Sequence, residues 1–266
     1  MAGFSEDWVY PEDHPISRQR AEALLRGGLG AYYLKIVQQS CAPIYWYRSV
    51  AGGRGNIIAN GTITFVRTPS RSFGVTANHV IQDYEALIGS EGLVAQIFRA
   101  RYEPKIISRS ERLDLITLEI PEQVLSNLGK EIVPLSLPRP HDVPQEGRGI
   151  LLGGYVGQER REVSPSVVEW GMLGAVGVAR RVSEKQITWS PDREHHIDVM
   201  GFPPLPPHKD LGGISGGPLI ALFEKANGQL AYHSLGGVIV EANPQIENVV
   251  AIRSEFIRAD GTLRHC

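Results

Sequence analysis

The chain has 266 residues, of which 42% are hydrophobic and 21% are charged, and its formal net charge at pH 7 is −2. These values are typical of a globular protein that holds one large domain or two small ones. So small a net charge gives no general electrostatic reason to bind nucleic acid or an anionic membrane. No run approaches the ~20 apolar residues that a membrane-spanning helix needs. We therefore expect neither nucleic acid nor a membrane as a partner.

The first residues and the cysteines bear on where the protein works. Residues 1–15 contain no apolar core of a secretory signal. Cys41 and Cys266 are the only cysteines, and two are too few for a disulfide framework. We expect a cytoplasmic, reducing location.

Residues 16–39 form the first predicted element. The segment is rich in helix-forming residues, but Gly27, Gly28 and Gly30 interrupt the pattern. The sequence predicts either one helix with a break or two short helices. We treat residues 1–40 as an N-terminal helical extension.

After Cys41 the pattern changes to short apolar or alternating runs, such as GTITFVRT and DLITLEI, with turn signals between them. This rhythm favours an antiparallel all-β fold over repeated βαβ units. A proline-containing segment at 135–147 resembles a linker. We therefore expect a first β-unit over residues 41–140 and a second over residues 141–266, the latter with a C-terminal segment.

Three motifs carry residues suited to nucleophilic catalysis. A serine hydroxyl is a weak nucleophile and needs an imidazole to take its proton. The imidazole in turn needs a carboxylate that fixes its tautomer. His79, Asp114 and Ser215 supply these groups in that chain order, within the motifs VTANHV (75–80), LDLITL (113–118) and GISGGP (213–218).

The three motifs and their order resemble those of the chymotrypsin/trypsin-like serine peptidases. The resemblance implies two packed antiparallel six-stranded β-barrels, with the His and Asp in the first and the Ser in the second. It implies that His79 is the general base, that Asp114 orients it, and that Ser215 attacks a peptide carbonyl of a polypeptide substrate. The backbone N–H groups of Gly213 and Ser215 would form the oxyanion hole. No cofactor or metal is expected.

One residue departs from the digestive members of that family. In those proteins an Asp precedes the serine and pairs with the N-terminus that activation cleavage releases. Ile214 cannot form this pair, so we expect no activation of that kind. The N-terminal helical segment could instead pack on the barrels or regulate them, and an activating or regulatory protein partner is an open alternative.

Substrate preference is weakly encoded. The resemblance implies that Val240, Glu241 and Ala242 line the primary pocket and pair with an extended substrate. Lys209 falls near the base of that pocket and would favour an acidic side chain. Glu241 could neutralise Lys209 or favour basic residues itself, so the preference stays open.

Two other functions compete with the peptidase. The G-x-S-x-G pattern of residues 213–217 also occurs in α/β-hydrolases, but that fold needs an Asp and then a His after the serine. Here Asp260 and His265 lie close to the C-terminus, and His233 precedes Asp260. The stronger alternative is an inactive or latent double barrel that binds peptides or regulates a partner.

A metal site is a further alternative. His195, His196 and His208 could suggest one, but no Cys or acidic ligand spacing of a known type accompanies them. We interpret these histidines as surface or loop residues.

Overall fold

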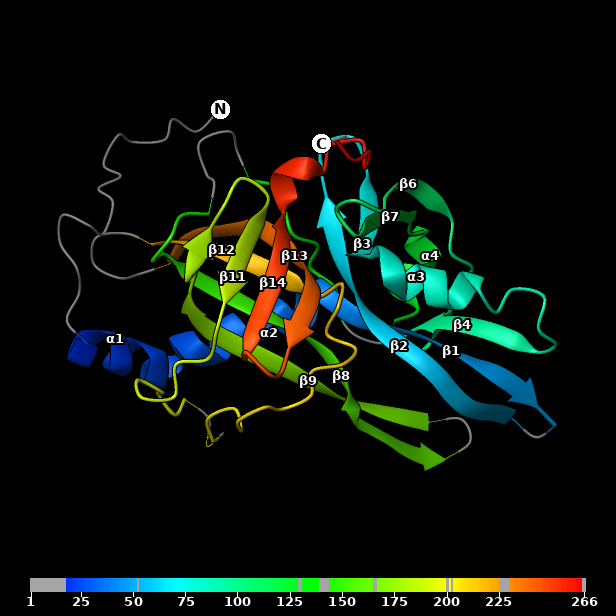
Figure 1. Ribbon diagram of the computed structural model, residues 1–266, viewed down its shortest axis with the longest axis horizontal. Coiled ribbons are helices and arrows are strands. Elements are labelled where there is room, and N and C mark those ends of the chain that lie inside the picture. The colour runs from blue at the N-terminus through cyan, green and yellow to red at the C-terminus, as the bar shows by residue number, and fades with distance from the viewer. Residues whose placement is uncertain are drawn as a thin grey trace.

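The computed structural model describes residues 18–51, 53–128, 131–138, 144–164, 167–199, 201, 203–224 and 230–264. The chain folds mainly into β-strands, arranged in two antiparallel sheets that lie side by side, with a helical segment before the first strand (Figure 1). The expected all-β class with an N-terminal helical extension is confirmed. Cys266 and residues 1–17 lie outside the described residues.

The first sheet has the strand order β5-β4-β1-β2-β3-β7-β6. It contains β1 (Cys41–Val50), β2 (Gly53–Arg67), β3 (Ser72–Ala77), β4 (Leu93–Ile97), β5 (Ala100–Arg101), β6 (Ile106–Ser110) and β7 (Leu115–Glu119). The second sheet has the order β10-β11-β14-β13-β12-β8-β9. It contains β8 (Gly149–Ser164), β9 (Val167–Val178), β10 (Arg181–Val182), β11 (Gln186–Trp189), β12 (Pro218–Glu224), β13 (Leu230–Asn243) and β14 (Asn248–Arg253).

Hydrogen bonding joins seven strands in each sheet, one more than the six expected for each barrel. Each sheet includes one two-residue strand, β5 or β10, and sequence patterns do not resolve strands this short. Among the described residues, no ladder joins β5 to β6 or β9 to β10, so both sheets are open by hydrogen bonding.

The N-terminal helical segment breaks where its glycines predict. Helix α1 (Arg18–Leu24) runs into a π-type turn η1 (Leu25–Leu29) and then into α2 (Gly30–Ser40). Within the turn Gly28 has φ +111°, which a residue with a Cβ rarely adopts. The other short helices are α3 (Asn78–Glu85), α4 (Glu122–Ser126) and the 3₁₀ turn η2 (Ser254–Phe256). No described helix has both the length and the hydropathy that crossing a bilayer requires.

The three largest apolar clusters form most of the interior of the described chain. One fills the first sheet and includes Trp46, Phe65 and Ile116, and another fills the second sheet and includes Leu152 and Ile239. The third lies between the sheets, and we call it the shared core. It contains residues of both sheets together with three of α2: Tyr33, Ile36, Val37, Phe73, Val75, Leu115, Leu151, Tyr155, Ile220 and Val238.

Helix α2 therefore belongs to the structure of both sheets. It packs on β8 and β9 of the second sheet and on β1 and β2 of the first. Tyr33 and Val37 are almost completely buried. Burying side chains of this size stabilises the fold by about 1.5–3 kcal/mol each.

The chain also crosses back from the second sheet at its C-terminal end, where residues 254–264 lie against the first sheet (Figure 1). There Thr117 Oγ1 donates a hydrogen bond to Gly261 O at 2.6 Å. Leu263 N donates to Ser108 Oγ at 3.1 Å. The two sheets are thus tied together at both ends of the described chain.

Candidate active site

The register of β3 against β7 brings His79 to Asp114. Ala77 at the end of β3 pairs with Leu115 at the start of β7. His79 follows β3 in the first turn of α3, and Asp114 directly precedes β7. The two residues therefore face each other, although they are 35 positions apart in the sequence. The sequence expectation placed these two residues in one site, and the structure brings them together.

Asp114 holds His79 through both carboxylate oxygens. Its Oδ2 lies 2.6 Å from His79 Nδ1, and its Oδ1 accepts the His79 backbone N–H at 2.9 Å. The Asp114 carbonyl also accepts the N–H of Asn78 at 2.9 Å. With φ +50°, Asp114 adopts a left-handed conformation that Asp tolerates better than most residues. Buried Leu113 and Leu115 fix the backbone on either side.

The hydrogen bond to Asp114 raises the pKa of His79 above its usual value of 6.5. Burial acts in the opposite direction, but less strongly. A bond donated from Nδ1 to Asp114 leaves the lone pair on Nε2. That nitrogen is then free to accept a proton.

Ser215 lies in the segment between β11 and β12, and we call residues 209–217 the serine loop. Gly216 in this loop has φ +89°, and a Cβ there would lie 1.9 Å from Thr62 O and 2.1 Å from Thr76 Oγ1. The loop therefore rests directly on β2 and on the end of β3, just before His79. No hydrogen bond among the described residues joins Ser215 Oγ to His79 Nε2. Catalytic hydrogen bonds are often long in the absence of substrate.

The backbone carbonyls in the last seven residues of the serine loop, 211–217, are fully used. Every carbonyl oxygen from Leu211 to Gly217 accepts a hydrogen bond; in chain order the donors are Ile214 N, Gly157 N, Thr62 Oγ1, Gly217 N, Thr62 N, Thr64 Oγ1 and Ile239 N. Four of the N–H groups in the loop also donate, namely those of Gly212, Ile214, Gly216 and Gly217.

Only the N–H groups of Gly213 and Ser215 donate no hydrogen bond between Gly212 and Gly217 in the described chain. Gly213 and Ser215 are half-buried, whereas Ile214, Gly216 and Gly217 are buried, so these two donors in one tight turn remain accessible to a group that enters the site. Because a peptide group is planar and trans, each N–H points opposite to the carbonyl of the same group. Gly212 O and Ile214 O are held by Gly157 N and Gly217 N, and this fixes the direction of both free donors.

Three strands hold the serine loop in this conformation. From the first sheet, Thr62 and Thr64 on alternate positions of β2 reach the loop carbonyls. From the second sheet, Ile239 of β13 both donates to Gly217 O at 2.8 Å and accepts from Gly216 N at 2.7 Å. The third contribution comes from β8.

Strand β8 reaches the loop through a bulge. It advances five residues between the pairs Tyr155–Met172 and Arg160–Trp170, while β9 advances two. The residues that protrude, 156–159, run along the serine loop: Gly157 N donates to Gly212 O at 2.7 Å, Gln158 Nε2 donates to Asp210 Oδ2 at 3.1 Å, and Glu159 pairs with Lys209. A bulge of this kind re-aims residues toward a neighbouring element.

The strand expected to bind substrate has a free edge beside the serine loop. Strand β13 pairs with β12 only as far as Val238, which faces Pro218. From Glu241 to Asn243 it pairs with β14 alone. Val240 sits at a register shift, Glu241 is exposed, and Ala242 is half-buried. An unpaired edge is a template on which an extended peptide can add as a strand.

Lys209 pairs with a different acid from the one considered in the sequence. Its Nζ contacts Glu159 Oε1 on the β8 bulge, not Glu241. Lys209 also lines a small cavity of about 20 Å³ together with Trp189, Leu211 and Val249. That volume holds about one water molecule.

An ion pair fixes the segment that leads into the serine loop. Arg193 donates two hydrogen bonds to the Glu247 carboxylate, at 2.8 and 2.6 Å, and its Nε donates to Leu205 O at 2.7 Å. His208 N donates to the same carboxylate at 2.9 Å. Mainly because of the bonds from Arg193, the pKa of Glu247 falls to about 2. The pair joins the segment before Lys209 to the turn between β13 and β14.

The histidines considered as metal ligands face other groups. His195 Nδ1 lies 2.9 Å from Asp192 Oδ2, and His208 Nδ1 lies 2.9 Å from Pro244 O. Within the described ranges, no group of three or more His, Cys, Asp or Glu side chains is placed to hold a metal ion.

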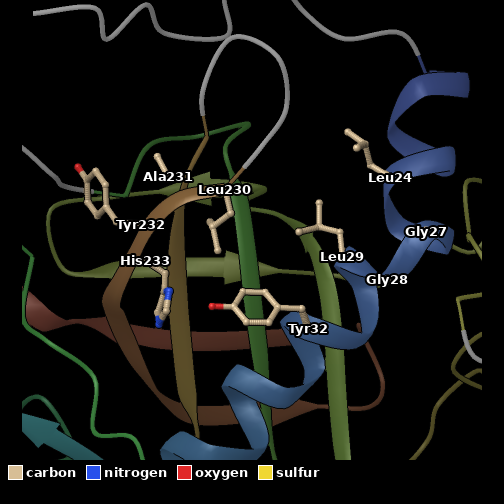
Figure 2. Close-up of a pocket in the computed structure, with 9 residues that line it drawn as sticks. All are labelled: Leu24, Gly27, Gly28, Leu29, Tyr32, Leu230, Ala231, Tyr232 and His233. Atoms are coloured by element: carbon tan, nitrogen blue, oxygen red, sulfur yellow. The ribbon is translucent and has the colours of Figure 1, made fainter. Parts of the chain in front are cut away.

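A second hollow lies on the second sheet, between the helix break and β13. Its volume is about 650 Å³, and Figure 2 shows its lining: Leu24, Gly27, Gly28, Leu29, Tyr32, Leu230, Ala231, Tyr232 and His233. Burial lowers the pKa of His233 in its wall. This hollow contains none of the residues expected to be catalytic.

The sequence reading missed Thr62, Thr64 and Gly157. The two threonines belong to the run GTITFV, in which alternating Thr and apolar residues are typical of any half-buried strand. Gly157 gave a weak signal, because a glycine inside a strand pattern often marks a bulge.

Comparison with known proteins finds similarity at low sequence identity, among solved structures. No protein-family model matches the chain, and no curated protein sequence matches it. Among solved structures, the Rv3671c protease from M. tuberculosis in its active form is 18% identical, with 88% of this chain and 82% of that chain covered and a TM-score of 0.44. The inactive form of that protein, with serine replaced by alanine, is 18% identical over 88% of each chain, with a TM-score of 0.40.

A further similar structure comes from work on the coupled folding and binding of the intrinsically disordered Sesbania mosaic virus VPg protein. It is 15% identical, with 82% of this chain and 91% of that chain covered and a TM-score of 0.43.

Proposed function

We propose that the protein is a serine endopeptidase that cleaves polypeptides through an acyl-enzyme intermediate. The observation that carries the proposal is the pair of unpaired N–H groups, those of Gly213 and Ser215, in the segment 211–217, where every carbonyl is bonded. Two such donors beside a serine are the arrangement that stabilises a developing oxyanion. The His79–Asp114 pair supplies the base that the serine needs.

The residues would act in the following order. Ser215 Oγ attacks the peptide carbonyl carbon while His79 Nε2 takes its proton, and the carbonyl oxygen becomes an oxyanion bound by the two N–H groups. The C–N bond then breaks and His79 returns the proton to the leaving amine. Water, activated by His79 in the same way, hydrolyses the acyl-enzyme. Asp114 stabilises the imidazolium in both steps.

The free edge of β13 supports a peptide as the substrate. The backbone of residues 240–242 has no β12 neighbour, so it can pair with an extended peptide next to Ser215. An exposed Glu241 on that edge would favour a basic residue in the peptide, whereas Lys209 is already paired with Glu159. We also infer a cytoplasmic location, with which a buried Cys41 that forms no disulfide within the described residues is compatible.

A fluorophosphonate probe tests the proposal. We expect it to label the wild-type protein on Ser215, and Ser215→Ala to abolish labelling. His79→Ala should be nearly as damaging, because the two residues act as a unit. Ser126→Ala, at an exposed serine of α4, is the matched control and should label like the wild type.

One observation favours a latent state as the second candidate. Ser215 Oγ makes no hydrogen bond to His79 among the described residues. A protein that stays unlabelled at every pH, and that binds peptides equally well with Ser215→Ala, would be a peptide-binding or regulatory module instead.

A further inference from the structure

Thr62 uses all its polar atoms at the junction of the two sheets. Its N–H donates to Ser215 O at 2.8 Å, and its Oγ1 donates to Gly213 O at 2.9 Å. The same Oγ1 accepts the N–H of Tyr155 at 2.9 Å, and its carbonyl accepts Thr76 Oγ1 at 2.7 Å. Thr62 is completely buried, so water cannot replace any of these partners.

The hydroxyl proton of Thr62 has a fixed direction. Tyr155 N can only donate, so Oγ1 accepts from it and directs its own proton to the carbonyl of Gly213. The hydroxyl thus links β8 to the serine loop. A Cβ on Gly154, beside Tyr155, would lie 2.8 Å from Thr62 Oγ1, so this glycine leaves room for the hydroxyl.

Thr62 fixes the peptide groups on both sides of the one that carries the Ser215 N–H. Gly213 O belongs to the peptide group before it, and Ser215 O belongs to the peptide group after it. Because peptide groups are rigid planes, fixing two flanking carbonyls restricts the rotation of the group between them. The orientation of the Ser215 N–H therefore depends on a residue of the other sheet.

We propose that Thr62 is a positioning residue that holds the serine loop in the conformation in which Gly213 and Ser215 present their N–H groups. The inference rests on the proposed function and adds which residue keeps these two N–H groups in position. Ile214 is fully buried in the second sheet's core and forms no ion pair, so the loop has no charged anchor at that position. The neutral bonds of Thr62 take that role, and they do not depend on a cleaved N-terminus.

The test compares Thr62→Val with Thr62→Ser and with Thr117→Val. Valine has the shape of threonine without the hydroxyl, whereas serine keeps the hydroxyl. Thr117 is the matched control, because it is also completely buried and its hydroxyl also donates to a backbone carbonyl, that of Gly261, away from the serine loop. The first readout is labelling by a fluorophosphonate, with its maximal rate constant and its half-saturating concentration measured separately.

We expect Thr62→Val to lower the maximal labelling rate about 10- to 100-fold, somewhat less than the roughly 10²–10³-fold that loss of a whole oxyanion donor costs. The half-saturating concentration should change less than about threefold, since the loop and not probe binding is affected. Thr62→Ser should restore the rate, and Thr117→Val should leave it near that of the wild type. Equal rates in Thr62→Val and Thr117→Val would overturn the inference while leaving the peptidase proposal intact.

Hydrogen exchange of the segment 211–217 gives a readout that needs no activity. Thr62→Val should speed its exchange, whereas Thr62→Ser and Thr117→Val should not. If the wild type is not labelled, the peptidase proposal fails, and this exchange alone decides whether Thr62 holds the loop; unchanged exchange would refute it. If Thr62→Val does not fold, Thr62→Cys, whose thiol is a weak donor, should give intermediate exchange and labelling, and wild-type values for both would refute the inference.

Discussion

The serine loop meets neutral, buried partners on the β2 side and exposed, partly charged partners on the β8 side. Thr62 and Thr64 on β2 are completely buried and bind the loop through hydroxyl and backbone groups. On the β8 bulge, Gln158 and Glu159 are exposed and face Asp210 and Lys209. Exposed ion pairs contribute about 0–1 kcal/mol, whereas a buried polar group that loses its partner costs about 1–3 kcal/mol. The position of Ser215 therefore depends more on β2 than on β8, which contributes chiefly through the backbone of Gly157.

The largest effect is expected on the β2 side, at Gly216. In Gly216→Ala the new Cβ would lie 1.9 Å from Thr62 O, on a backbone with φ +89°, so both strain and a steric clash result. We expect a loss of at least about 3 kcal/mol in the free energy of unfolding, measured by denaturant titration.

Gly147→Ala is the control for Gly216→Ala. Gly147 also has a positive φ, +77°, but a Cβ there meets no atom within 4 Å. Its cost should be only the backbone strain of about 1–2 kcal/mol. Similar losses for the two variants would show that contact with β2 contributes little.

The next prediction concerns pH and distinguishes the role of His79 from that of the β2 threonines that hold the serine loop. Labelling needs neutral His79, so its rate should rise about tenfold per pH unit and level off above pH 6.5, because the bond to Asp114 raises the pKa. Asp114→Asn removes the main cause of this rise and should move the midpoint down. The hydroxyls on the β2 side do not titrate, so Thr62→Val should lower the plateau without moving the midpoint. A moved midpoint would show that Thr62 also affects the titration of His79.

The same pKa has an opposite consequence for stability. Folded His79 binds its proton more tightly than the unfolded chain does, so its contribution to stability is fully present below pH 6.5 and is lost as the pH rises through the raised pKa. Compared with wild type, His79→Ala should therefore lose more stability at pH 5 than at pH 9, which thermal unfolding at the two pH values measures.

The smallest effect is expected on the β8 side. Glu159→Gln removes the charge that faces Lys209 but keeps the size of the side chain. The free energy of unfolding should change by less than about 1 kcal/mol, and 1 M NaCl should reduce even that difference. A tenfold loss of labelling in Glu159→Gln would show that the ion pair on the β8 side positions Ser215, contrary to the greater role assigned to β2.

The fold class could be predicted because it rests on local patterns, whereas the pairing of His79 with Asp114 is predicted from the resemblance of their motifs to those of the chymotrypsin/trypsin-like peptidases. Alternating runs and turns indicate strands, and VTANHV and LDLITL place each residue at a strand end. The helix break could also be predicted, since glycines mark it.

The supports of the serine loop could not be predicted, because they depend on contacts between distant strands. Nothing in the run around Thr62 distinguishes a threonine that binds the serine loop from one that fills a strand face. The partner of Lys209 likewise depends on the bulge in β8, whose register no sequence pattern gives.

The shared core has a consequence for dividing the chain. Side chains from α2 and from both sheets fill it together, and Thr62 and Ser215 stand on opposite sides of the same junction. A chain cut between β7 and β8 would yield one fragment with His79 and Asp114 and another with Ser215. Each fragment would expose the apolar side chains that it contributes to the shared core. Such fragments should recombine, and because each lacks part of the proposed site, labelling of Ser215 should return only on reassembly.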